Sequence, residues 1–453
     1  MSLKIFHITE YCHAGGIGGT ERYVLDLIRE LKAKGVCNSI VWLTGSHHDP
    51  FMADGVRIVP LPTPAMRIDE AKSDLVTRVE QLFNELQPDV LHFHTFGLSE
   101  AAIAQVARRR GIPYVFTFHS PAWSCRRGDL LEWGKQPCDG QVLALRCSAC
   151  KLHERVGGPR WFNYALALAS IPAGWFFSCD SNLDRRRRIA FVSDTARFGR
   201  ALRMFLKNCG IVFACAEWSV SVLHKNGTLE QRIKLCPQGV STQFQNNPHS
   251  VTTAAAVQSP RRKDFVIGFV GRPSQVKGIH ILIEGFRMLE APEAKLRIYG
   301  WSKSGMESAW CEKIEQMACA DPRVKLIPAL PLEQMQAEYP NLDILAIPSV
   351  WFETGPLVLM EALQFGIPVF GSNRIGQLRL LRERGRVIEM NTPEGWRLAL
   401  ENAWNLYQTG KWDQERRRAR GSGRLRTMSD VAAEVLQTYT QIRTSRADFP
   451  AIV

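Results

Sequence analysis

The first 120 residues alternate between two hydrophobic patterns. Apolar runs of strand length stand at 3–9, 38–43, 56–59, 89–94 and 113–118. Between most of them apolar residues recur at helical spacing, as Val24, Leu27, Ile28 and Leu31 do in a helix expected over 21–34, and again near 70–86 and 99–110. This strand–helix alternation predicts an α/β fold whose parallel sheet is covered on both faces.

The alternation breaks at 121–185 and then returns. A helix at 189–209 and a strand at 211–216 follow the break, and a second block has strands at 265–270, 295–299, 324–327 and 343–347 with helices at 279–289 and 305–318. Residues 241–264 are polar and have the composition of a linker. We therefore expect two doubly wound Rossmann-like domains, 1–240 with an insertion at about 121–185, and 265–428. Their strands' carboxyl ends are expected to face an interdomain cleft that holds the ligands.

The charge composition limits the classes of partner that the protein is expected to bind. The net charge of +13, from 57 basic and 44 acidic residues, includes arginine runs at 108–110, 185–188 and 416–418. These runs are either a solvated face or a surface for an anionic partner such as a membrane leaflet or a lipid-phosphate acceptor. No RNA- or DNA-binding signature accompanies them, so we expect no nucleic acid partner.

The hydropathy along the chain indicates where in the cell the protein is expected. The segment MSLKIFHITE enters a strand pattern at once, without the long apolar run of a signal peptide. No stretch reaches the roughly 20 apolar residues that a spanning helix needs. Residues 161–177 come nearest, but they are short and contain Pro172, which favours a core or interfacial segment. The expected location is the cytoplasm, with peripheral contact to the inner membrane.

Twelve cysteines without a secretion signal indicate reduced thiols. Four of them cluster in the insertion: Cys125, Cys138, Cys147 and Cys150. Two pairs of thiolates can close a tetrahedral structural zinc site, although the first pair is too widely spaced for the usual pattern. Unliganded thiols or a redox pair remain the alternatives.

The segment 349–372 places two glutamates across the start of a helix. Pro356 suits the first helical turn, Gly366 suits the helix end, and a buried strand follows. Glu353 is then expected in a loop beside the helix N-terminus, a natural phosphate site, with Glu361 further along the helix. One carboxylate can bind hydroxyls near a phosphate and the other can bind hydroxyls further away, as a sugar–diphosphate–nucleoside requires. The alternative is two solvated glutamates beside an amphipathic helix.

A second motif, GRPSQVKG at 271–278, follows a predicted strand and precedes a helix. Gly271 allows a ligand to approach the backbone. Arg272 and Lys277 supply two cations that suit a diphosphate and offset the charge on a departing nucleotide. Taken alone, the motif is equally compatible with a solvated basic turn.

Together, GR-x4-KG and E-x7-E resemble the retaining nucleotide-sugar glycosyltransferases of family 4, which have the GT-B fold. HAGGIGGTER at 13–22 is similar to the first glycine loop of that family, and VFTFHS, which ends with His119 and Ser120, to its active-site histidine segment. FACAEWSVSVLHKNG and KLCPQGV, within 213–240, are similar to its last N-domain strand and helix. CRRGDL at 125–130 resembles a cysteine-bearing subgroup, whereas Gln377 stands near a position where many relatives have a glutamate.

The resemblance implies roles for individual residues. The backbone N–H groups of Gly18 and Gly19 approach the distal phosphate, and Arg272 and Lys277 bind the diphosphate. The donor sugar is held by Glu353 and His119, and the ribose by Glu361. Thr354, Gly355 and Pro356 line the same loop as Glu353. Of two further histidines, we expect His92 to serve packing and leave the role of His94 open.

The resemblance also implies an activity: transfer of a hexosyl unit, with retention and without a catalytic metal or other cofactor, to a saccharide or lipid-linked acceptor in bacterial surface glycan synthesis. A final helix within 429–453 is expected to cross back to the N-terminal domain. The alternatives are another GT-B enzyme, namely a sugar-nucleotide epimerase or a phosphorylase, and a non-catalytic protein that binds nucleotide sugars.

Overall fold

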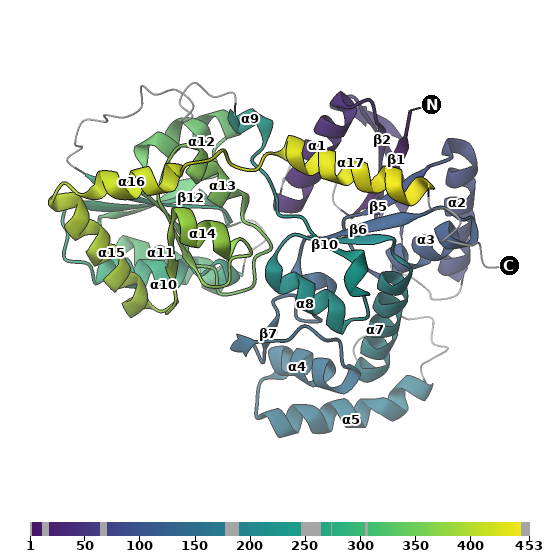
Figure 1. The fold of residues 1–453 in the computed structure, drawn as a ribbon. Helices are drawn as coiled ribbons and strands as arrows, with labels where there is room; N and C mark the ends of the chain where they lie inside the picture. Colours follow the sequence, from purple (N-terminus) through teal and green to yellow (C-terminus); the bar gives the residue numbers. More distant parts are fainter. Residues whose placement is uncertain are drawn as a thin grey trace. The chain divides into compact units, whose positions relative to one another are not determined.

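The computed structural model describes residues 2–10, 18–63, 70–176, 190–245, 264–272, 274–303 and 307–444. The chain divides into two compact units: unit 1 is Met1–Pro237 with Ser429–Val453, and unit 2 is Gln238–Met428. Most of the predicted linker, namely 246–263, lies outside the described residues, as does the arginine run at 185–188. Each unit is described by itself (Figure 1).

Unit 1 is built on an eight-stranded sheet of order β10-β9-β6-β5-β1-β2-β4-β3. Its pairings are parallel except that of β3 with β4. The strands are β1 (Lys4–Thr9), β2 (Cys37–Thr44), β3 (Phe51–Ala53), β4 (Val56–Pro62), β5 (Val90–Phe93), β6 (Tyr114–Phe118), β9 (Ile211–Ala214) and β10 (Ile233–Leu235). The helices outside the insertion are α1 (Gly19–Ala33), α2 (Glu70–Leu86), α3 (Leu98–Arg109), α7 (Phe191–Asn208), α8 (Glu217–Lys225) and α17 (Met428–Thr444).

The predicted insertion has secondary structure of its own. It contains the 3-10 turn η1 (Pro121–Trp123), the hairpin of β7 (Leu131–Glu132) and β8 (Gln136–Pro137), and the helices α4 (Ala144–Val156) and α5 (Arg160–Phe176). Both helices pack against α7 and against each other (Figure 1). None of the helices in the described ranges is long and apolar enough to cross a membrane.

Unit 2 has a six-stranded, wholly parallel sheet of order β13-β12-β11-β14-β15-β16. The strands are β11 (Phe265–Val270), β12 (Ala294–Trp301), β13 (Val324–Pro328), β14 (Ile344–Ile347), β15 (Val369–Ser372) and β16 (Arg386–Ile388). The helices are α9 (Thr242–Gln245), α10 (Ile279–Arg287), α11 (Ser308–Cys319), α12 (Leu332–Glu338), α13 (Leu357–Gln364), α14 (Leu378–Arg384), α15 (Pro393–Gln408) and α16 (Trp412–Arg420). The strand order reverses between β11 and β14, which is where such sheets bind ligands.

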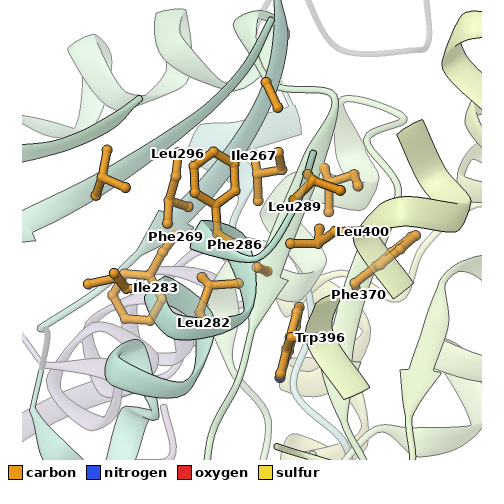
Figure 2. Close-up of a cluster of buried hydrophobic side chains, with 14 of the residues drawn as sticks. Ile267, Phe269, Leu282, Ile283, Phe286, Leu289, Leu296, Phe370, Trp396 and Leu400 are labelled. Atoms are coloured by element: carbon orange, nitrogen blue, oxygen red, sulfur yellow. The ribbon is translucent and has the colours of Figure 1, made fainter. Parts of the chain in front are cut away.

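Alternate residues of β11 explain why this strand sits at the centre of its sheet. Ile267 and Phe269 pack with Phe286 of α10 and Trp396 of α15 on one face (Figure 2). Val266 belongs to a second buried cluster on the other face. A strand buried on both faces reads as a continuous apolar run, and for this reason FVIGFV predicted β11 to the residue.

Both expected sheets are therefore confirmed as doubly wound α/β units, with local differences. Pro356 lies one position before α13, as its N-cap with φ −66°, rather than inside the first turn. Gly366 follows the helix end with φ +67°, as expected for a terminating glycine.

Candidate active site

The loop after β14 brings three donors onto one carboxylate oxygen. Glu353 Oε1 accepts from Lys277 Nζ at 2.6 Å, Ser349 Oγ at 2.5 Å and Trp351 Nε1 at 3.3 Å. The Glu353 side chain is 7% exposed and that of Lys277 28%. Two motifs 76 residues apart in sequence thus meet at the carboxyl ends of β11 and β14.

The charge state of this carboxylate follows from its partners. Burial alone would raise the pKa of Glu353, but the Lys277 ammonium and the hydrogen bonds from Lys277, Ser349 and Trp351 outweigh burial and lower it. Glu353 is therefore an anion at neutral pH, and its Lys277 partner lies over the Trp351 ring at 5.6 Å. The site holds a fixed negative charge and a cation that solvent can reach.

The loop that carries Glu353 is held by backbone contacts. Glu353 N donates to Arg374 O at 2.9 Å, and Ser372 Oγ donates to Ser349 O at 2.7 Å. A Cβ on Gly376 would lie 2.2 Å from Thr354 O, so this position requires glycine. The sequence analysis gives Gly376 no role, although it is the glycine of IGQ at 375–377.

Glycine is also required where β11 turns into α10. Gly278 has φ +72°, and a Cβ there would lie 1.9 Å from Pro348 O. This close approach holds the Lys277 turn against the end of β14, beside the loop of Glu353. Gly271 has φ +142°, while the Arg272 side chain is exposed and makes no ion pair or hydrogen bond within the described ranges.

The remaining predicted residues of this loop lie nearby. Thr354 is 7% exposed, and a Cβ on Gly355 would lie 3.1 Å from Gln377 Nε2. Glu361, on α13, accepts a hydrogen bond from Tyr339 OH at 2.6 Å. Sequence analysis missed Tyr339, Ser349 and Trp351 as partners of the glutamates, and it named Gln377 only as a departure from the relatives.

In unit 1, the described part of the glycine loop is the start of α1. Gly18 is the N-cap and Gly19 begins the helix, while residues 13–17 of the motif lie outside the described residues. A Cβ on Gly19 would meet nothing within 4 Å, whereas one on Gly18 would lie 2.6 Å from Glu21 Oε2. The Gly19 backbone is thus uncovered within the described structure.

His119 follows β6 and lies beside the other histidines of the sheet. Its Nε2 is 3.1 Å from His94 Nδ1, and its ring packs edge-on against Tyr23. Burial lowers the pKa of His119 to about 3, so the ring is neutral. His92 is bound by Tyr439 OH at 2.5 Å and Thr117 Oγ1 at 2.6 Å, which links α17 to the sheet.

The zinc hypothesis for the four cysteines is not supported. Within the described ranges, the metal-ligating atoms of three residues lie within 4.8 Å of one another only at His7, His92 and His94. The cysteine sulfurs have local partners instead: Cys150 Sγ accepts from Trp133 N at 3.2 Å and Cys138 Sγ from Gly140 N at 3.5 Å. Burial raises the pKa of both thiols to about 11.

Two family matches decide what these sites belong to. Residues 251–417 match the family described as Glycosyl transferases group 1, and residues 17–144 match Glycosyltransferase Family 4. The chain carries glycosyltransferase domains. The first match contains the Lys277–Glu353 cluster and the second contains His119, so each predicted set of residues lies in a glycosyltransferase domain.

Solved structures show the same fold. Sucrose-phosphate synthase from Thermosynechococcus elongatus has a TM-score of 0.64 at 16% identity, and covers 98% of this chain and 100% of its own. Anabaena HepE, in complex with UDP and glucose, has a TM-score of 0.58 at 15% identity and covers 98% of both chains. The GT-B fold is thereby confirmed for this glycosyltransferase chain.

Curated relatives match over a shorter stretch. D-inositol 3-phosphate glycosyltransferase from Corynebacterium urealyticum is 32% identical over 144 residues, which are 30% of this chain and 34% of the relative. The enzyme of the same name from Corynebacterium efficiens is 32% identical over 139 residues, 29% of this chain and 32% of the relative. The chain thus matches about a third of the length of each.

Proposed function

We propose that this protein is a retaining glycosyltransferase that moves a hexosyl unit from a nucleotide-diphosphate sugar to a saccharide or lipid-linked acceptor. We further propose that it acts in bacterial surface glycan synthesis. The observation that carries the transferase part is the Lys277–Glu353 cluster at the switch point of the unit 2 sheet, inside a glycosyltransferase domain. Relatives with D-inositol 3-phosphate in their names and a fold neighbour with bound UDP support phosphate-bearing substrates.

The proposed donor contacts follow from charge and position. Lys277 and the exposed Arg272 would bind the diphosphate and offset the charge of the departing nucleotide without a catalytic metal. Glu353, with Thr354, Gly355 and Pro356, would face the sugar, and Glu361 would hold the ribose. Gly18 and Gly19 are proposed to approach the distal phosphate through their N–H groups. The hydrogen bond between His119 and the donor sugar rests on the resemblance alone.

Lys277 would exchange partners during this cycle. Without a ligand it is paired to Glu353, and an arriving diphosphate offers it more negative charge than one carboxylate does. Glu353 would then be released from its ion pair toward the hydroxyls of the sugar, while Ser349 and Trp351 keep hold of the same oxygen. Substrate binding would thereby free the Glu353 carboxylate to accept hydrogen bonds from the sugar.

A thermal-shift panel of UDP-, GDP- and ADP-sugars tests the donor class. One nucleotide sugar should raise the melting temperature through preferential binding to the folded state. Product analysis with that donor should show free nucleotide only when an acceptor is present, and the sugar's anomeric configuration should be retained. Nucleotide release without an acceptor would favour the epimerase. The absence of any shift across the panel would contradict nucleotide-sugar binding itself.

We also propose that the protein contacts an anionic membrane surface through α5. The side of this helix that faces the protein carries Asn163, Ala167 and Ser170, which are buried. Its outer side carries Trp161, 71% exposed, and Leu168, 50% exposed. This pattern is inverted relative to an ordinary surface helix, which hides its large apolar side chains.

The charge around α5 favours lipid over another protein copy. The sequence from Trp161 to Phe176 contains no charged residue, and the exposed Arg155 and Arg160 border it on a chain of net charge +13. Apolar insertion beside basic residues is typical of helices that lie in an anionic interface. A lipid-linked acceptor would be met at that surface.

Vesicle co-sedimentation tests this contact. Binding to vesicles with anionic phosphatidylglycerol should fall at least tenfold in the double variant Trp161→Gln, Leu168→Gln, because each exposed apolar side chain contributes about 1 kcal/mol or more on insertion. Met288→Gln, at a 47% exposed position of unit 2, is the control. Unchanged binding of the double variant would overturn the proposal, as would a dimer that the same variant dissociates.

For location we propose the cytoplasm. All ten cysteines in the described ranges are free thiols, including the paired-looking Cys147 and Cys150. Free thiols in this number are typical of a reducing compartment. Fractionation should therefore divide the protein between the cytosol and the inner membrane.

A further inference from the structure

Four polar side chains in unit 1 form a continuous hydrogen-bonded row. Asn38 Oδ1 is 3.0 Å from His7 Nε2, His7 Nδ1 is 3.0 Å from His94 Nε2, and His94 Nδ1 is 3.1 Å from His119 Nε2. The row crosses four strands or strand ends, from β2 through β1 and β5 to β6. The rings of His7 and His94 are wholly buried, and His119 is 6% exposed.

One backbone carbonyl sets the direction of every bond in this row. Asn38 Nδ2 donates to Val36 O at 3.0 Å, and a carbonyl oxygen can only accept, so Asn38 must turn its own oxygen toward His7. His7 Nε2 must then carry a proton to donate. Had His7 its proton on Nδ1 instead, two lone pairs would face each other across 3.0 Å.

The same reasoning passes from ring to ring because the rings are neutral. Burial lowers the pKa of His7 to about 4 and that of His94 well below its usual value, so each ring carries one proton. His7 Nδ1 therefore accepts from His94 Nε2–H, and His94 Nδ1 accepts from His119 Nε2–H. His119 is left with its proton on Nε2 and a lone pair on Nδ1.

We propose that Asn38, His7 and His94 are positioning residues that fix the orientation and tautomer of His119, so that its Nδ1 can only accept a hydrogen bond. The proposal rests on the proposed function in assigning a sugar hydroxyl as the group that donates to this atom. It goes beyond that function in naming the atom and the three side chains that determine its proton. A ligand group that can only accept would be rejected at this position.

His92 stands outside the row although it lies on the same strand end. Both of its nitrogens are already engaged, with Tyr439 OH and Thr117 Oγ1. A metal that took one nitrogen of His92 would have to break one of these two bonds. The hydrogen-bonded row leaves both of them intact.

Nuclear magnetic resonance tests the tautomers without any substrate. In the full-length protein labelled with 15N-histidine, long-range proton–nitrogen spectra distinguish a proton on Nε2 from one on Nδ1. His7, His94 and His119 should all show the Nε2–H form at pH 7, and the signals are assigned by single substitutions. An Nδ1–H form of His119 in the wild-type protein would overturn the proposal, as would a metal-shifted signal after addition of zinc alone.

Two substitutions at His94 then separate positioning from packing. The amide oxygen in His94→Asn can take the place of Nδ1 and still accept from His119, whereas His94→Leu offers no acceptor. We expect His94→Leu to lower kcat about tenfold, as the loss of one hydrogen bond predicts, with a smaller change in KM, and His94→Asn to recover most of it. Equal losses in both variants, with the His119 tautomer unchanged, would make the row merely structural.

The outcomes distinguish this proposal from the proposed function. If His119 shows the Nε2–H tautomer but the protein transfers no sugar, the positioning row stands and the proposed transferase function fails. If the protein transfers sugar while His119 is in the Nδ1–H form, the function stands and the positioning row fails. Asn38→Leu adds a check at the far end, because it should mix the tautomers of all three rings.

Discussion

The two units place polar groups at their strand ends in opposite ways. Unit 1 buries a row of neutral rings, each with a proton on one nitrogen and an acceptor on the other. Unit 2 holds a full ion pair, with Glu353 buried and Lys277 partly open to solvent. Both reach the carboxyl edge of a parallel sheet, the row through His94 and His119, so the difference comes from the side chains rather than from the fold.

This difference indicates which site is rigid and which can exchange its partners. A buried neutral row has no charge to compensate, and rotating one ring would break bonds on both its sides, so it is suited to holding one orientation. An ion pair with a solvent-facing lysine can be exchanged for a stronger anion at little desolvation cost. We therefore expect the row in unit 1 to hold His119 in one orientation, and the ion pair in unit 2 to open when a diphosphate binds.

The largest expected effect comes from removing the negative charge of unit 2. Glu353→Gln keeps the shape and the hydrogen-bond acceptor but loses the anion, and turnover should fall roughly 1000-fold, at the upper end for one preorganised electrostatic group. Affinity for the nucleoside diphosphate should stay equal or rise, because Lys277 is no longer neutralised by the carboxylate. Steady-state kinetics and calorimetry measure the two quantities.

The matched control for this change is Glu383→Gln. Glu383 also pairs with a cation, Arg379 at 3.0 Å, but both side chains are more than half exposed. Turnover there should remain within twofold of wild type, since exposed pairs contribute little. A thousandfold loss with weaker nucleotide binding at Glu353 would mean that it holds the nucleotide rather than the sugar.

The next largest effect is expected when the positive charge of Lys277 is removed. Lys277→Met should weaken nucleoside diphosphate binding roughly 30-fold, as expected when a hydrogen-bonded charge of about 2 kcal/mol is lost. The loss should be the same in EDTA and in magnesium, because the proposal gives the electrostatic role to side chains. The double variant Lys277→Met, Glu353→Gln separates lost attraction from the cost of an unpaired carboxylate. A strict requirement for magnesium would contradict the metal-free mechanism.

Part of the fold and of the site could be predicted from the sequence. The strand at 265–270 was predicted in full, because burial on both faces leaves an unmistakable apolar run. The resemblance assigned Lys277 and Glu353 to one donor site, but their ion pair was not predicted. Nothing in the sequence pointed to Asn38, since its contact with His7 depends on the register of β2 against β1, and register cannot be read from one chain.

A smaller effect concerns the stability of unit 1 in acid. The pKa of His7 in the folded state is about 4, below the 6.5 of the unfolded chain. Between these values the unfolded state binds more protons, so stability falls as pH falls from 7. Wild type should lose about 2 kcal/mol more between pH 7 and 5 than His7→Leu does, measured by urea unfolding.

Comparing wild type with His7→Leu cancels the titrating groups of unit 1 whose pKa does not depend on His7. Burial raises the pKa of Glu100 to about 7, which acts in the opposite direction, but Glu100 is present in both proteins. His280→Leu is the counterpart in unit 2: burial lowers the pKa of His280 to about 4 as well, yet that ring is only partly buried. Its effect should be smaller, and an equal effect would erase the contrast between the units.

The smallest expected effect on stability is at the glycine that opens α1. Gly19→Ala places a methyl group where nothing lies within 4 Å and should change the free energy of unfolding by less than about 0.5 kcal/mol. Gly278→Ala is its counterpart, with φ +72° and a Cβ 1.9 Å from Pro348 O, and should cost about 2 kcal/mol or more. Because Gly19→Ala leaves the fold intact, a several-fold loss of nucleotide-sugar affinity in that variant would arise at the ligand. Unchanged affinity would remove Gly19 from the phosphate site and leave diphosphate binding to unit 2 alone.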